Sequence, residues 1–280
     1  MAITGTGTQA DPYIVDTWSD FVTAVGTTGA YVEVVPGTVW EMNKIAPNGI
    51  GNINVKCQEV NGHGVIIQAA NVTGSAFFVF SQAATFRRMN FESITSQGRF
   101  CTANQNATFK KISIDGVYNA INDCFVYADE GYVSFEADAP EYEGEKELGC
   151  GIAIKMNNGS GFGGSYRNGT RIYVESSSIY YEGNNFDSPY GRYRGVGIYD
   201  SYITGRLGTA NFYTARRSII NASGTIARDN NGGGDEYITQ TVVNTDLAQI
   251  SSGPFIAVTD AQLKDANYLS SIGIPIGVEI

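Results

Sequence analysis

The sequence predicts an all-β protein in which short strands repeat and stack. The stretch ATFRRMNFESI at residues 84–94 returns, nearly residue for residue in type, as ATFKKISIDGV at residues 107–117. Apolar and polar residues alternate within both copies, as in a strand with one buried face. The chain also holds 34 Gly, 17 Tyr and 14 Phe but only 16% charged residues, which is typical of many short strands joined by tight turns.

The repeat has a period of about 23 residues. A further copy at residues 130–140 is expected to align four columns: Phe86, Phe109 and Tyr132; Met89, Ile112 and Phe135; Phe91, Ile114 and Ala137; and Glu92, Asp115 and Asp138. Going backwards, Ile67 is expected beside Met89. A strand repeat of this length cannot bury its apolar face alone, so successive copies must stack into one continuous core.

Both ends of the chain contain short helical patterns that would close such a core. Residues 17–26 predict an amphipathic helix with Thr17 as N-cap and Gly26 as its end. Residues 258–273 predict a second helix with Thr259 as N-cap. The apolar tail at 274–280 is expected either to fold over the last repeat or to contact a partner subunit.

The period, together with the run GTGTQADPYIVDTWSDFVTAV at residues 5–25, resembles right-handed parallel β-helix (pectate-lyase-like) proteins of phage or prophage origin. The resemblance implies a single-stranded right-handed parallel β-helix with coils of about 20–25 residues. We expect an N-terminal cap at 1–30, the β-helix at 31–250 with a loop insertion near 139–169, and a C-terminal cap or subunit-contact tail at 251–280.

The resemblance also implies a function: a structural surface protein of a phage particle, such as a capsid decoration, head fibre or short tail spike, that binds host glycan. A homotrimer in contact with other virion proteins is then expected. The alternatives are a polysaccharide lyase or glycoside hydrolase, and a bacterial surface adhesin. The net charge of −10 disfavours nucleic acid as a partner. Without a leader or an apolar run of 18 residues, we expect synthesis in the host cytoplasm, no membrane insertion and a place on the virion surface.

The acidic column is the candidate catalytic site. Glu92, Asp115 and Asp138 would lie on neighbouring coils, about 4.8 Å apart at the backbone. Carboxyl groups about 5 to 5.5 Å apart suit a retaining glycosidase. A solvated charge pattern, with Arg88 and Lys111 on the same outer face, is the alternative, and it leaves enzymatic activity open but not favoured.

Two other groups could bind ligands. The candidate glycan-binding or partner-binding residues are Arg88, Lys111, Tyr190, Arg192, Tyr193 and Arg194, since Tyr and Arg are frequent at interface hot spots. Asp229, Asp235 and Glu236 offer oxygen ligands for Ca²⁺, although a turn is the simpler interpretation and no cofactor is expected. His63, the sole histidine, excludes His-based triads and is interpreted as a turn residue. Cys101 and Cys124, one period apart, are expected to be reduced thiols in a packing ladder.

Overall fold

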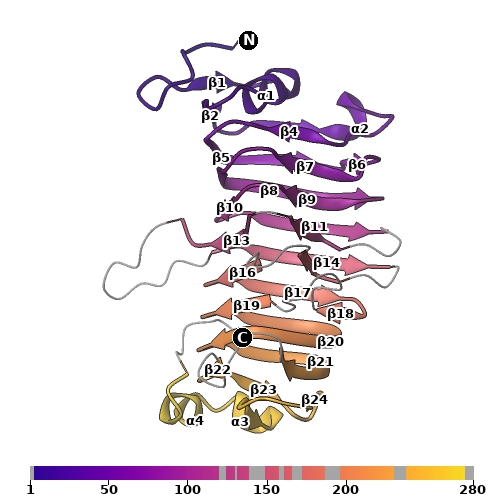
Figure 1. Cartoon of the computed structure of the whole chain (residues 1–280), viewed down its shortest axis with the longest axis vertical. Helices are drawn as coiled ribbons and strands as arrows, with labels where there is room; N and C mark the ends of the chain where they lie inside the picture. The colour runs from indigo at the N-terminus through magenta and orange to yellow at the C-terminus, as the bar shows by residue number, and fades with distance from the viewer. Residues whose placement is uncertain are drawn as a thin grey trace.

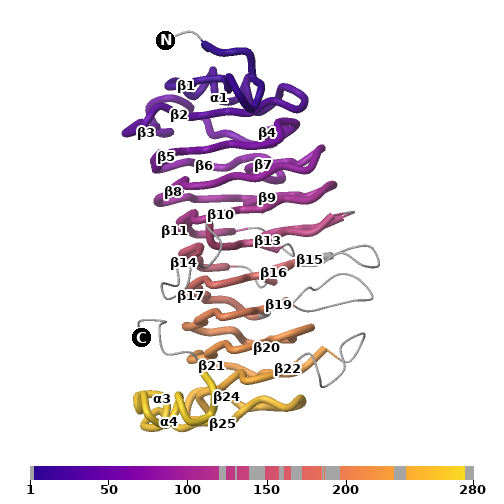
Figure 2. The backbone as a smooth tube through the Cα atoms, turned by 90° about the vertical axis from the view of Figure 1, so that its left-hand side faces the viewer, coloured from indigo at the N-terminus to yellow at the C-terminus, as the bar shows by residue number. Residues whose placement is uncertain are grey.

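The computed structural model describes residues 3–119, 124–129, 131–138, 149–157, 161–165, 172–186, 196–229 and 238–274. Parallel strands run across a long axis and successive turns of the chain lie one above the next, with the N-terminus at one end and helices α3 and α4 at the other (Figures 1 and 2). The described strands form a main sheet, sheet A, and a smaller sheet C.

The strands of sheet A are β1 (Tyr13–Val15), β2 (Tyr31–Val34), β3 (Val39–Glu41), β5 (Glu59–Gln68), β6 (Asn71–Val72), β8 (Ala84–Ser96), β10 (Ala107–Lys110), β11 (Ser113–Tyr118), β13 (Val133–Glu136), β14 (Gly151–Met156), β16 (Ile172–Glu175), β17 (Ser178–Glu182), β18 (Asn185–Phe186), β19 (Val196–Tyr199), β20 (Tyr202–Arg216), β21 (Ile219–Arg228), β22 (Ile238–Thr239), β23 (Val242–Asn244), β24 (Ala248–Ile250) and β25 (Ile256–Val258). Sheet C contains β4 (Ile53–Val55), β7 (Ala76–Phe80), β9 (Arg99–Ala103), β12 (Val126–Ala128) and β15 (Gly163–Ser165). The helices are α1 (Trp18–Val25), α2 (Met42–Ile45), α3 (Asp260–Leu263) and α4 (Ala266–Ser271).

Sheet A closes on itself through two long strands. β8 pairs with β10 along its first part and with β11 along its second, and β20 pairs in the same way with β17 and β19. β13 and β16 join β10 to β19, while β14 joins β11 to β17. The hydrogen-bond connectivity is therefore a closed parallel barrel of 9 strands with extra strands.

This closure corrects the predicted fold class. The high strand content agrees with the prediction. The arrangement of the strands does not: sheet A is a closed parallel barrel and not the expected β-helix solenoid of the pectate-lyase-like kind. Two long strands produce the closure: β8 and β20 pass through a bend without ending, with φ angles of 54° at Arg88 and 63° at Gly208, so that one ladder continues into the next.

The repeat predicted the register of the first two copies. Ala84 lies opposite Ala107 and Phe86 opposite Phe109, as expected. The third copy is shifted: Phe135, and not Tyr132, lies opposite Phe109, because the next turn of the chain is longer. Two other columns need the same correction, since Ile152 and not Ala137 follows Ile114, and Ile67 lies beside Phe91 and not beside Met89.

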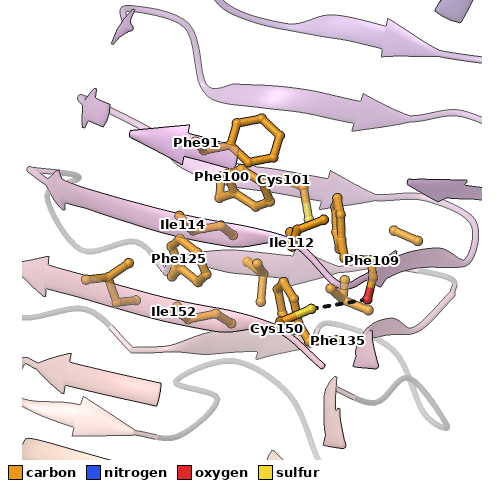
Figure 3. Close-up of a cluster of buried hydrophobic side chains, with 14 of the residues drawn as sticks. Phe91, Phe100, Cys101, Phe109, Ile112, Ile114, Phe125, Phe135, Cys150 and Ile152 are labelled. Atoms are coloured by element: carbon orange, nitrogen blue, oxygen red, sulfur yellow. Dashed lines mark hydrogen bonds between the residues drawn. The ribbon is translucent and has the colours of Figure 1, made fainter. Parts of the chain in front are cut away.

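Phenylalanines of successive turns form the core. Phe86, Phe109 and Phe135 are fully buried in one column, with ring centroids 6.1 and 5.3 Å apart. Phe100 and Phe125 approach from the side of sheet C; Phe100 lies 5.3 Å from Phe109 and 5.5 Å from Phe125 (Figure 3). Such aromatic pairs contribute about 0.5–1.5 kcal/mol each beyond burial of their area, so the column ties several turns of the chain together.

Helix α1 covers the N-terminal end of this core, as predicted. The Thr17 side chain accepts a hydrogen bond from the backbone N–H of Asp20, and the helix ends at Gly26. Its buried Trp18 and Phe21 rings lie 5.3 and 5.0 Å from the Trp40 ring, so the helix is anchored by aromatic contacts.

The C-terminal helix is in fact two short helices. Thr259 caps α3 through a capping box with Gln262, as its position predicts, but Asp265 then caps a new helix, α4. Both helices lie against the outer side of the last strands, where Leu263 and Leu269 form a second apolar cluster with Tyr202, Ile219, Val242, Val258 and Ile274. Of the apolar tail, only Ile274 is among the described residues, and it is buried in this cluster.

Two strands fall inside the stretch 139–169 that the sequence predicts to be a loop insertion. β14 belongs to sheet A and β15 to sheet C. The prediction of a loop overlooked Phe162, a core residue within the Gly-rich segment. Its ring is fully buried and lies 4.6 Å from the Phe186 ring and 5.5 Å from the Phe125 ring. Residues 139–148, 158–160 and 166–169 of this stretch lie outside the described residues.

A ladder of hydroxyl groups satisfies the backbone at one corner of the stack. The Ser177, Ser201 and Ser218 hydroxyls each donate to the carbonyl two residues earlier, at 2.7, 2.7 and 2.8 Å. They accept, in turn, the backbone N–H groups of Cys150, Ser177 and Ser201 at 2.9, 3.3 and 3.2 Å. Buried N–H groups must find partners, so the hydroxyls take over where the strand ladder stops.

The four cysteines are buried thiols, none of them in a disulfide. Cys101 lies opposite Val126, so the expected ladder of Cys101 with Cys124 is wrong by two residues, while the prediction of reduced thiols is confirmed. Burial raises the pKa of Cys57 and of Cys150 to about 12, and it also raises that of Cys101. The Cys150 thiol donates to the Phe109 carbonyl at 3.4 Å, shown as the dashed line in Figure 3.

Candidate functional site

The structure does not assemble the predicted acidic column. Glu92 lies opposite Gln68, whose side-chain amide donates to it at 3.3 Å. Asp115 is exposed on β11 and lies opposite Ala153, beside a shift in the register between β8 and β11. Asp138 follows the end of β13 and lies beside Arg87 and Arg88. The three carboxyl groups therefore do not form a row on one face.

Asp138 is paired with two arginines and not with other acids. Its side chain is only 2% exposed, and its carboxyl oxygens lie 2.6 Å from Arg88 Nε and 3.7 Å from Arg87 Nε. A buried carboxylate is tolerated where cations neutralise it. Arg88 and Lys111 both adopt positive φ at corners, so neither lies in line with the strand residues that were expected to share its face.

Most of the predicted aromatic and calcium candidates lie outside the described residues. These are Tyr190, Arg192, Tyr193, Arg194, Asp235 and Glu236. Asp229 is described and is 4% exposed. Within the described part of the chain, no group of three or more His, Cys, Asp or Glu side chains is placed to hold a metal ion.

A polar depression lies near the N-terminal end, where sequence reasoning placed no site. Its lining comes from the N-terminal turn (Gln9 and Pro12) and from the outer sides of β2 and β5: Tyr31, Val32, Glu33, Glu59 and Asn61. The depression is shallow and open to solvent, and its enclosed volume is about 60 Å³. In the parallel register, Tyr31 lies opposite Glu59 and Glu33 opposite Asn61, so the ladder itself brings the two acids together diagonally.

The N-terminal turn is held over β2 by its backbone. Thr8 and Asp11 exchange N–H to carbonyl hydrogen bonds, both at 3.2 Å, and the Tyr31 N–H donates to the Gly7 carbonyl at 2.9 Å. Gly7 has a φ of 76°, and a Cβ there would lie 2.6 Å from the Tyr13 ring. Only glycine fits this position, so Gly7 fixes the wall that Gln9 and Pro12 provide.

Both acids of the depression have basic partners. Arg87 Nη2 lies 3.0 Å from Glu59 Oε2, and His63 Nε2 lies 3.5 Å from Glu33 Oε2. His63 lies within β5, at a bend where its φ is 48°, so its interpretation as a turn residue between strands is wrong. The signal that could have found these residues is the repeat column itself, because Glu33, Asn61 and Arg87 succeed one another in register on β2, β5 and β8.

Together, the fold and the depression define a mostly β protein with a small polar surface depression. Comparisons with protein-family models, with curated proteins and with solved structures gave no match. No described helix is long and apolar enough to cross a membrane.

Proposed function

We propose that this chain is a rigid structural protein whose outer surface binds glycans. The observation that carries the proposal is the continuous core: aromatic side chains run without interruption from Trp18 through the Phe86 column to Phe212 and Phe255, each ring within 7 Å of the next. A core of this kind couples many turns of the chain, which suits a protein that must stay folded while it presents a surface.

The proposal keeps the structural and glycan-binding parts of the expectation from sequence. It does not include a phage particle, because the fold resemblance behind that part is corrected and no matching protein supports it. Polysaccharide cleavage is not advanced as a second function, since the three acids predicted to perform it do not converge. A homotrimer remains a prediction that light scattering of the purified protein would test.

The experiment measures binding and cleavage on the same samples. Purified protein is incubated with a panel of bacterial capsular and cell-wall polysaccharides, retention is measured by co-sedimentation, and polymer length is measured by size-exclusion chromatography. The proposal expects retention of at least one polysaccharide with no loss of its length. Loss of length that disappears in Asp115→Asn would instead make the protein an enzyme, and no retention of any polymer would refute glycan binding.

A further inference from the structure

We propose that the depression formed by the N-terminal turn, β2 and β5 is a binding site for one uncharged sugar unit of a glycan. The inference rests on the proposed function and gives it a location. Its lining combines two side-chain amides (Gln9 and Asn61), two carboxylates (Glu33 and Glu59) and the ring of Tyr31. Amides supply both donors and acceptors, and carboxylates accept two hydrogen bonds at once, which matches neighbouring hydroxyl groups of a sugar ring.

The charge of the lining favours a neutral ligand. Two carboxylates disfavour any anion. Glu59 already has the Arg87 guanidinium beside it at 3.0 Å, and Glu33 has the His63 Nε2 beside it at 3.5 Å, so neither carboxylate lacks a neighbouring nitrogen. These pairs are only partly exposed, with 30% of the Arg87 and Glu59 side chains accessible, so they hold the acceptor oxygens in place more than they attract new charge.

The apolar part of the lining fits one face of a sugar. Tyr31 is half-buried, and both Tyr31 and Pro12 line the depression. Aromatic residues with a polar tip suit surfaces that are partly apolar and partly wet. The depression is shallow and open to solvent, with an enclosed volume of only about 60 Å³, so it would contact one face of a single sugar unit at a chain end or side branch and would not enclose a ligand.

The test uses single glycosides and two pairs of matched variants. Saturation-transfer NMR and calorimetry are run with the methyl glycosides of glucose, galactose, mannose, rhamnose and N-acetylglucosamine. We expect millimolar binding of at least one of them, weakened about 10-fold by Tyr31→Ala and several-fold by Glu33→Gln. The controls are Tyr180→Ala, which changes a tyrosine that is 48% exposed elsewhere, and Glu182→Gln, which changes an acid paired with Lys155 at 3.3 Å; neither should alter binding. Melting temperatures verify that each variant is folded.

The outcomes separate this inference from the proposed function. Lack of binding of every glycoside, or equal weakening by Tyr180→Ala, would overturn the site. Displacement of the bound glycoside by 1 mM CaCl₂ or spermidine would also overturn it, because the site would then bind cations in preference to neutral sugars. If a polysaccharide is retained equally by wild type and Tyr31→Ala, the protein binds glycans but not here, so the inference fails while the proposed function stands.

Discussion

Replacement of Tyr118 by Phe should stabilise the protein. Tyr118 is 1% exposed, and within the described part of the structure its hydroxyl has no hydrogen-bond partner. Its ring packs edge-on against Phe125, with centroids 4.9 Å apart, and Phe would keep that contact. A buried polar group without a partner costs about 1–3 kcal/mol, so removal of the hydroxyl should increase the free energy of unfolding by about 1 kcal/mol.

The same substitution has a pH dependence with a definite sign. Burial, with smaller contributions from Cys101 and Asp115, raises the pKa of Tyr118 above its ordinary value. The unfolded chain ionises this phenol near pH 10 while the folded protein keeps it neutral, so wild type loses stability as the pH rises above about 10. Tyr118→Phe lacks this loss, and its advantage should therefore widen by up to about 1.4 kcal/mol per pH unit.

Guanidinium denaturation of wild type and Tyr118→Phe at pH 7, 10 and 11 measures both effects. Tyr180→Phe is the control, because Tyr180 is 48% exposed and its hydroxyl can reach water. A Tyr118→Phe variant that is less stable than wild type at pH 7 would refute the reasoning, since it would mean that the hydroxyl is hydrogen-bonded in solution.

Three further predictions concern the core, the turn and the thiols. Phe109→Ala should lower the free energy of unfolding by about 3–5 kcal/mol in guanidinium denaturation, because the ring lies at the centre of the Phe column; a loss under 1 kcal/mol would contradict its place there. Gly7→Ala should leave the fold intact by circular dichroism but reduce glycoside binding, since a Cβ would displace the N-terminal turn; unchanged binding would separate the turn from the site. The thiols should react with a disulfide reagent only on unfolding, and stability should fall between about pH 9 and pH 12 as the unfolded thiols ionise, with a shallower fall in Cys57→Ala; fast reaction of the native protein would contradict their burial.

The sequence was most informative where every turn of the chain must place the same kind of side chain in the core. Phe86 and Phe109 could be placed opposite each other because both must fill the same space in a stacked core. The capping of α1 by Thr17 could be predicted because the N-cap needs only local hydrogen bonds. Register failed at Tyr132, where the length of the intervening turn changes and no local rule fixes how the extra residues are accommodated.

Closure of the main sheet could not be predicted for a related reason. Arg88 and Lys111 both adopt positive φ at a corner, which neither residue type favours, yet β8 continues through its corner whereas β10 ends at Lys110, so no local signal tells the two cases apart. The stack imposes it on them: in both copies the inward-facing residues before and after the corner, such as Phe86 and Met89, must reach the same core. Tertiary packing therefore overrides the local preference.

The candidate site follows from an exception to the repeat. Along one outer column, Glu33 is succeeded by Asn61, Arg87, Lys110 and Glu136, so charge changes from turn to turn while the core column beside it remains apolar. A depression forms where that variable column meets a segment outside the repeat, the N-terminal turn held by Gly7. Residues of the core column are constrained by packing, whereas residues of the outer column and of the N-terminal turn are not. It follows that substitutions in the depression should change ligand binding at little cost in stability, whereas substitutions in the Phe column should do the reverse.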